Sequence, residues 1–307
     1  MRINTNISSL GAQEAAQNTN KSIANSLEKL STGLKINKAS DDASGLAIAD
    51  KLRTQVTSIN QGISNGNSAV ALLQITDKSM AEQSKILDTI KSKLIQANTD
   101  TTSTAGRTAI AKDVTKLLQQ LNNIGEQTNY NGTTLLQKAR TTLNASTEGN
   151  LTAARTAKGG LSFQIGEGTA DLITTRTINS NVAGLKLSAL AKAVRSGAKV
   201  SAGATAGTTG VFTRTMAQSG QKAIDDAITT LNGYRGDIGS TQNQVESAVR
   251  NLMTQSTNIK AAESVIRDVD YAEESANFNK LNIISQAGSY AISQSNATQQ
   301  NVLRLLQ

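Results

Sequence analysis

The sequence predicts a mainly α-helical protein in which both chain ends form an elongated antiparallel helical bundle or coiled coil, with a small β-hairpin region and a short exposed central insert. Three observations support this fold class. The 307 residues include no proline, so nothing prevents long uninterrupted helices. Aliphatic residues recur at heptad spacing in both halves of the chain. With 3 Phe, 4 Tyr and no Trp, aliphatic stripes rather than aromatic clusters must form the core.

Composition also limits the function. The chain lacks Cys and His, which excludes disulfides, thiol nucleophiles, Cys/His metal sites, catalytic triads and imidazole acid-base chemistry. We therefore expect no enzymatic activity and no cofactor. Residues 1–16 show no apolar region followed by a small-residue cleavage site, and no run of ~18 apolar residues occurs. We expect neither a cleaved signal peptide nor insertion into a membrane.

Both chain ends are mildly amphipathic. They place aliphatic residues at helical spacing, but neither end can complete a core alone. We expect these segments to pair with each other or with other copies and to fold on assembly. The residues expected to carry self-assembly are Ile3, Ile7, Leu10, Ile23, Leu27, Leu30, Leu34, Leu281, Ile284, Val302 and Leu305.

A long N-terminal helix is predicted to begin just after residues 40–42 and to end near Asn98. Residues 40–42 read Ser-Asp-Asp, whose side chains can accept hydrogen bonds from the free amides of a first helical turn. The Asn65-Gly66 pair ordinarily marks a turn, and glycine costs about 1 kcal/mol inside a helix. Because the heptad frame resumes in phase at Val70, a continuous helix is the preferred interpretation, and a break at this pair is the alternative.

Two further helices follow a similar pattern. The first has aliphatic residues in 4-3-4-3 spacing from Ile110 and is expected to stop at Gly125 or shortly after. The second, from about Ser219 to Asp270, has an aliphatic residue at every seventh position from Ile224. One bundle can bury all of these stripes. The seam residues of the long helices are Leu52, Ile59, Leu73, Leu87, Leu94, Ile238, Val245, Leu252, Ile259 and Ile266.

The centre of the chain has the two-residue period of a strand. Leu161, Phe163 and Ile165 alternate with polar residues, and residues 172–178 are rich in β-branched side chains. Gly166 lies between these segments as a turn residue. We expect a small antiparallel hairpin that packs on the helices near the tip of the bundle.

The centre is also basic. No acidic residue lies between Asp171 and Asp225, whereas the basic residues there are Arg176, Lys186, Lys192, Arg195, Lys199, Arg214 and Lys222. Residues 196–210 are rich in Gly, Ala, Ser and Thr, so we predict a loop or a small exposed insert. A solvated surface is preferred over a nucleic-acid site, because only Phe212 could stack on a base. Adhesion or recognition by this surface is a further hypothesis.

The chain resembles bacterial flagellins in several segments. Its N-terminal half contains MRINTNISSL, LSTGLKINKASDDASGLAIADKLR, ISNGNSAVALLQITDKSM and YNGTTLL, starting at Met1, Leu30, Ile63 and Tyr130. Its C-terminal half contains AAESVIRDVDYAEES and NVLRLLQ, and FQIGEG in the centre is similar to the start of the family's β-hairpin. The resemblance covers nearly the whole chain apart from about residues 189–216.

The resemblance implies a layered architecture. Residues 1–44 would pair with residues 271–307 as the inner helices of a hollow filament. Residues 45–188 would form the N-terminal rod helices plus the β-hairpin, and residues 217–270 the C-terminal rod helix. Residues 189–216 would be a short variable insert at the surface.

The resemblance also implies a function. The chain would be a structural subunit that self-assembles into the helical flagellar filament for swimming motility. It would be exported through the flagellar export apparatus without a cleaved signal peptide and become extracellular. Its partners would be other flagellin subunits, a chaperone on the C-terminal segment, and the filament cap and hook-associated proteins, with no nucleic acid and no membrane insertion.

One segment departs from the commonest family pattern. Many flagellins carry an arginine-rich stretch on the first rod helix that innate Toll-like receptors bind. In this chain the corresponding residues are Asp88, Thr89, Ile90, Lys91, Ser92 and Lys93. Thr89 stands where the family has the key arginine, and Lys93 where it has a leucine. We expect poor receptor recognition, since a multidentate guanidinium is lost and a lysine enters the interface.

Two alternatives were compared with the filament subunit. A hook-filament junction protein resembles flagellin at both chain ends but does not polymerise; the density of matches favours flagellin. A metallopeptidase carried on a flagellin scaffold needs an HExxH helix, and the chain has no histidine. By resemblance to the family, the central hydroxyl residues are possible O-glycan sites. They are Ser196, Ser201, Thr205, Thr208 and Thr209.

Overall fold

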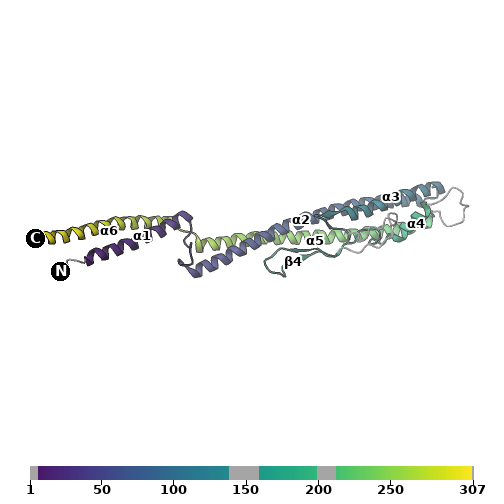
Figure 1. Cartoon of the computed structure of the whole chain (residues 1–307). Helices are drawn as coiled ribbons and strands as arrows, with labels where there is room; N and C mark the ends of the chain where they lie inside the picture. Colours follow the sequence, from purple (N-terminus) through teal and green to yellow (C-terminus); the bar gives the residue numbers. More distant parts are fainter. Residues whose placement is uncertain (1–5, 138–158, 199–211, 306–307) are drawn as a thin grey trace. The chain divides into compact units, whose positions relative to one another are not determined.

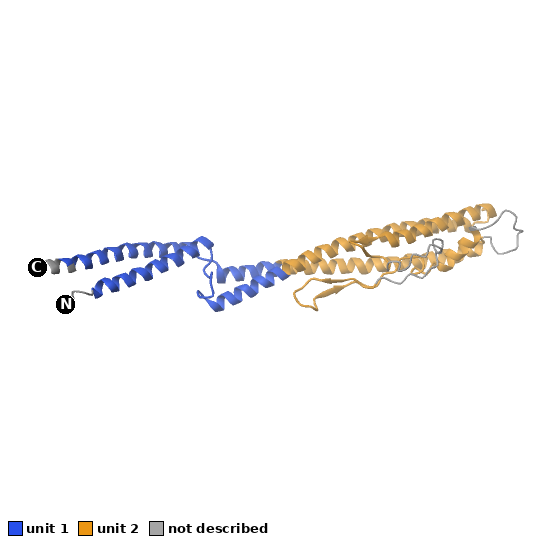
Figure 2. Ribbon diagram, in the orientation of Figure 1, with its two compact units in different colours: residues 1–58, 254–307 blue, residues 59–253 orange. Residues whose placement is uncertain are grey.

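The computed structural model of the chain describes residues 6–137, 159–198 and 212–305. The chain forms two compact units: unit 1 comprises residues 1–58 and 254–307, and unit 2 comprises residues 59–253 (Figure 2). The predicted mainly α-helical fold is confirmed. In chain order the elements are α1 (Ile7–Thr32), α2 (Ala43–Asn98), α3 (Thr104–Gln127), β1 (Asn129–Tyr130), β2 (Thr133–Thr134), β3 (Ser162–Gln164), β4 (Leu172–Thr174), α4 (Ser188–Ala198), α5 (Arg214–Arg267) and α6 (Tyr271–Leu305).

In unit 1, α1 and α6 lie side by side and run antiparallel (Figure 1). Asn6 Nδ2 donates a hydrogen bond to Ser295 Oγ over 3.3 Å at one end of the pair. Near the other end, the Ser26 hydroxyl donates to the Glu274 carboxylate. The expectation that the two chain ends pair with each other is therefore confirmed.

Backbone hydrogen bonds join the two linkers of unit 1. The Lys35 N–H donates to the Arg267 carbonyl over 2.7 Å, and the Val269 N–H donates to the Gly33 carbonyl over 3.0 Å. Gly33 ends α1 with a φ of 74°, the left-handed conformation that favours glycine. The linker after α1 and the linker before α6 are thus held together by backbone hydrogen bonds.

Asp42 caps the start of α2, as predicted from the Ser-Asp-Asp segment, whereas Asp41 binds backbone amides that precede the helix. Asp42 Oδ1 accepts from the Gly45 N–H over 2.9 Å, which caps the first helical turn. Asp41 Oδ2 accepts from the Lys38 and Asn37 N–H groups over 3.0 and 3.1 Å. These two backbone hydrogen bonds lower the pKa of the Asp41 carboxyl, because they stabilise its charged form.

We expect the turn at residues 37–41 to loosen in acid. Because the folded-state pKa of Asp41 lies below its ordinary value of 3.8, its stabilisation is complete above that pH and is lost as the pH falls through the lowered pKa. Hydrogen exchange of the Asn37 and Lys38 amides should accelerate beyond the intrinsic trend below about pH 4. Asp41→Ala should exchange faster already at neutral pH, and equal protection in the variant and the parent would contradict this account.

In unit 2, the long helices share an aliphatic core. Leu87 on α2, Leu121 on α3 and Leu231 on α5 are fully buried. α2 is helical through the Asn65-Gly66 pair, so the alternative of a break there is wrong. A Cβ on this glycine would overlap with the Val249 side chain of α5, so the residue serves close helix packing rather than a turn.

The β3–β4 hairpin is antiparallel, with Phe163 opposite Ile173, as the alternating pattern predicts. It lies beside α2, where Asn65 Nδ2 donates to the Gln164 carbonyl over 3.1 Å. Asn65 lies 33 residues before Asn98, the end of α2, which is about 50 Å along the helix. β4 also lies apart from α4 (Figure 1). The expectation of a hairpin near the tip of the bundle was therefore wrong. The residue that binds the hairpin, Asn65, lies in the middle part of α2.

A second hairpin, β1–β2, was not identified from the sequence. Asn129 pairs with Thr134 and Tyr130 with Thr133. Between them, Asn131 and Gly132 have φ values of 47° and 77°. Two positive φ values define a tight primed turn, and Asn-Gly is its commonest sequence.

Part of the expected central insert is a packed helix. The insert was placed at residues 189–216, but α4 covers the beginning of this range and packs against α3. Leu190 and Val194 are buried, and Phe212 is fully buried, so it could not stack on a base. The bounds 189–216 were wrong at this end because they followed the lapse of the family resemblance and overlooked the helical spacing of Leu187, Leu190 and Val194. Most of the loop predicted from the composition of residues 196–210 lies outside the described residues.

Candidate self-assembly surface

The α1–α6 pair leaves large apolar side chains in solvent. Ile7, Leu10 and Leu27 on α1 are 69%, 55% and 55% exposed. On α6, Ile283 is 67% and Tyr290 is 73% exposed. The packing of α1 against α6 therefore leaves these apolar side chains uncovered, as at surfaces that bind other proteins. We call the exposed apolar side chains of α1 and α6 the terminal surface.

The structure divides the self-assembly residues predicted from the sequence into two groups. Ile7, Leu10, Leu27 and Ile284 are exposed and belong to the terminal surface. Ile23, Leu30, Leu34 and Leu281 are half-buried. Ile3 and the side chains of Val302 and Leu305 lie outside the part of the chain that is described.

Sequence reasoning missed two of the most exposed apolar residues of α6, Ile283 and Tyr290. A signal for the first was present, because Ile283 and Ile284 are adjacent and successive residues of a helix point about 100° apart. Both isoleucines cannot face the same partner helix. One of them must therefore point away from α1 or meet another molecule.

The predicted seam residues of the long helices differ in burial between the two units. In unit 2 they are buried, with exposed fractions of at most 9%; these residues are Ile59, Leu73, Leu87, Leu94, Ile238, Val245 and Leu252. In unit 1, Leu52, Ile259 and Ile266 are half-buried. The seam of unit 2 therefore forms a complete core. The seam of unit 1 remains half-exposed, as expected for a part that binds other molecules.

The predicted receptor segment on α2 is only partly a surface. Ile90 is fully buried in the core of unit 2, so it cannot be a contact residue. Lys93 Nζ lies 3.2 Å from Asp113 of α3, and Lys91 pairs with Asp225 of α5. Asp88, Thr89 and Ser92 are exposed. The two lysines are thus held within the bundle surface by ion pairs.

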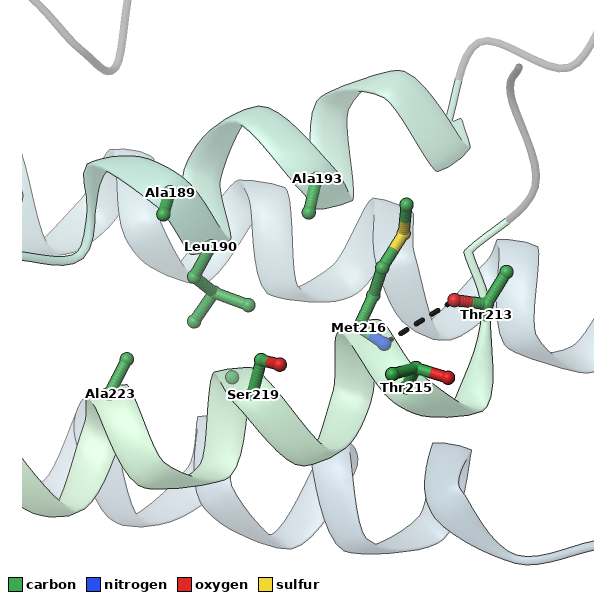
Figure 3. Close-up of a pocket in the computed structure, with 9 residues that line it drawn as sticks. Ala189, Leu190, Ala193, Thr213, Thr215, Met216, Ser219 and Ala223 are labelled. Carbon is green, nitrogen blue, oxygen red and sulfur yellow. Dashed lines mark hydrogen bonds between the residues drawn. The ribbon is translucent and has the colours of Figure 1, made fainter.

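A groove of about 420 Å³ lies between α4 and the start of α5 in unit 2 (Figure 3). Ala189, Leu190 and Ala193 form one wall, and hydroxyl and aliphatic side chains such as Thr213 and Met216 form the other. None of the described residues that line it has a titratable side chain.

The predicted glycan positions mostly fall outside the described residues. Ser196 is exposed on α4. Ser201, Thr205, Thr208 and Thr209 are outside the described ranges. Within those ranges, no helix is long and apolar enough to span a bilayer.

These features define a helical structural protein with a complete core in one unit and an unsatisfied apolar surface in the other. The N-terminal helical region of bacterial flagellin matches residues 3–141, and the C-terminal helical region matches residues 221–306. The chain is 33% identical to the flagellin of Bacillus subtilis and 32% identical to the 31.3 kDa flagellar filament core protein of Treponema maltophilum. Each alignment covers all of both chains. The chain belongs to the bacterial flagellin family.

A solved structure also shares the fold. A protein from Vibrio parahaemolyticus assigned as a flagellar hook-associated protein has a TM-score of 0.56 over 74% of this chain and 99% of its own. The two sequences are 15% identical, so the likeness concerns the fold alone. It does not favour a hook-junction role over a filament subunit.

Proposed function

We propose that this chain is a structural subunit of the bacterial flagellar filament and that the terminal surface of α1 and α6 drives its polymerisation. The observation that carries the proposal is the exposure of Ile7, Leu10, Ile283 and Tyr290 on two helices that are already paired. Burial of such side chains against neighbouring copies is favourable at about 25 cal/mol per Å² of apolar surface. Repetition of one heterologous contact then gives an open helical polymer.

The family supplies the remaining parts of the proposal. Residues 1–44 and 271–307 would form the inner layer of the filament, and residues 45–188 and 217–270 the rod. Export through the flagellar apparatus, a chaperone on the C-terminal segment, and cap and hook-associated proteins at the filament ends complete the expected partners. The subunit would act extracellularly and mechanically, without catalysis.

Seeded growth tests this function. Purified full-length chain should elongate filament seeds in electron micrographs, whereas a chain that lacks residues 296–307 should not. If the full-length chain stays monomeric on seeds, the filament-subunit proposal fails and the hook-junction alternative takes its place.

A pair of substitutions tests the terminal surface itself. Ile283→Ser changes a side chain that is 67% exposed, so it should reduce seeded elongation at least about tenfold while the helix content of the monomer stays unchanged. Leu281→Ser changes a half-buried neighbour and should lower both helix content and elongation. Elongation at the parental rate by Ile283→Ser would remove this face from the assembly contacts.

We further propose weak activation of the innate receptor that binds the corresponding segment of many flagellins. Thr89 offers one hydroxyl where the family has a guanidinium, and Lys93 is paired with Asp113. Thr89→Arg combined with Lys93→Leu should raise the response of receptor-bearing reporter cells about tenfold or more. A full-strength response to the unmodified chain would refute the proposal. Thr57→Arg, a change of the same type at an exposed position of α2, serves as the control.

A further inference from the structure

The surface of α3 and α4 in unit 2 carries basic residues that lie outside the terminal surface. Lys112 and Lys116 lie one turn apart on α3, and both are exposed. On α4, Lys192 is exposed and Arg195 is partly exposed. Because α3 packs against α4, these four side chains lie on adjoining helices. We call them the α3–α4 basic face.

Nearby acids do not neutralise the α3–α4 basic face. α4 contains no acidic residue. On α3, Asp113 is engaged with Lys93 of α2, and Glu126 lies ten residues beyond Lys116, about 15 Å along the helix. None of the four basic residues forms an ion pair within the described ranges.

Other basic residues at this end of unit 2 do form ion pairs with acidic residues. Arg214 pairs with Asp100 over 2.9 Å, and Lys91 pairs with Asp225. Some basic residues at this end of unit 2 thus meet a carboxylate, whereas the four residues of the α3–α4 basic face form no ion pair with the residues that the structure describes. An uncompensated cluster of this kind attracts an extended anion.

We propose that the α3–α4 basic face binds acidic polysaccharides, meaning chains whose sugars carry carboxylate or sulfate groups. Neither α3 nor α4 contains Phe, Tyr or Trp, and Phe212 is fully buried, so the face has no platform for stacking nucleic-acid bases. It also lacks the bulky aromatic anchors of membrane-surface helices. Gln119 and Gln120 lie one turn beyond Lys116 and can hydrogen-bond sugar hydroxyls.

In a filament, many copies of the α3–α4 basic face would bind one polysaccharide more strongly than a single copy does. This consequence rests on the proposed function. A single cluster of exposed lysines binds a polyanion loosely and in a salt-dependent way. In a filament, one polysaccharide could engage several copies at once, and the second contact would form at a high effective concentration. The binding of the single chain does not depend on assembly and can be measured separately.

The test uses full-length monomers and a soluble polyuronate, with uncharged dextran as the negative control. At about 50 mM salt, the triple variant Lys112→Gln, Lys116→Gln and Lys192→Gln should bind the polyuronate at least about tenfold more weakly than the parent. The matched control removes three exposed lysines elsewhere. These are Lys51, Lys78 and Lys260, each changed to Gln. Its affinity should fall by no more than about twofold, since its net charge changes equally but the face is intact.

Three outcomes would overturn the proposal. The first is no binding by the parent, and the second is an equal loss in both triple variants, which would indicate attraction by net charge alone. The third is equally tight, equally face-dependent binding of single-stranded DNA or of anionic vesicles, which would assign the face to another partner. Seeded elongation of the Lys112, Lys116 and Lys192 variant, measured in parallel, separates these results from any failure of the filament role.

Discussion

Leu87→Ala should lower the free energy of unfolding of unit 2 by about 2–5 kcal/mol. Leu87 is fully buried on α2, with Met80, Ile90 and Leu94 also fully buried along the same helix. Truncation to Ala removes apolar contacts and leaves a cavity, and the surrounding helices can relax into it only in part. Because the core contains so few aromatic side chains, each leucine of the seam carries a large share of the packing.

Ile95→Ala is the matched control for Leu87→Ala. Ile95 lies on the same helix and is 52% exposed, so its truncation should change the free energy of unfolding by less than about 0.5 kcal/mol. Denaturant unfolding followed by circular dichroism measures both variants. Similar losses for the two would mean that the heptad frame does not define the core of unit 2.

The heptad spacing of the sequence predicted the helices well because one physical rule governs their burial. A stripe with a period near 3.5 residues must face a partner along its whole length, so α2, α3 and α5 were recognised with ends close to those observed. The aspartates before α2 and the polar break after Asn98 gave the boundaries, since caps act locally. Signals of this kind depend on residues near each other in the chain.

Two features that depend on contacts between distant segments were mispredicted, the position of the β3–β4 hairpin and the presence of α4. The seat of the β3–β4 hairpin requires Asn65 to meet Gln164, a pairing that spacing along the chain cannot reveal. α4 was hidden because small residues follow its apolar stripe. In the candidate site, amphipathic spacing predicted only that the chain ends pair with each other or with other copies. The resemblance to flagellins implied that the two ends pair with each other, and α1 does pack against α6. Which of Ile283 and Ile284 is left more exposed depends on the rotation of α6 against α1, and this is set by packing.

Gly62→Ala and Gly233→Ala should change stability in opposite directions. A Cβ at Gly62 would overlap with the Ile165 carbonyl oxygen, a backbone atom at the end of β3 that cannot rotate away. The hairpin must shift, which costs about 1–3 kcal/mol. At Gly233 on α5 a Cβ would meet nothing within 4 Å. Alanine there should stabilise the helix by about 0.5–1 kcal/mol, because it restricts the unfolded chain more than glycine does.

Gly66→Ala should have an effect on stability between those of Gly62→Ala and Gly233→Ala. It tests whether overlap with the added Cβ causes the loss. Its Cβ would overlap with one methyl group of the Val249 side chain rather than with a backbone atom, so the loss should be smaller than for Gly62→Ala. Amide chemical shifts should change throughout residues 162–174 in Gly62→Ala and remain close to the parental values in Gly233→Ala. A stabilising effect of Gly62→Ala would mean that the gain in helix propensity exceeds the cost of the overlap with the Ile165 carbonyl. Retention of the hairpin shifts would mean that β3–β4 is held by contacts other than its approach to α2.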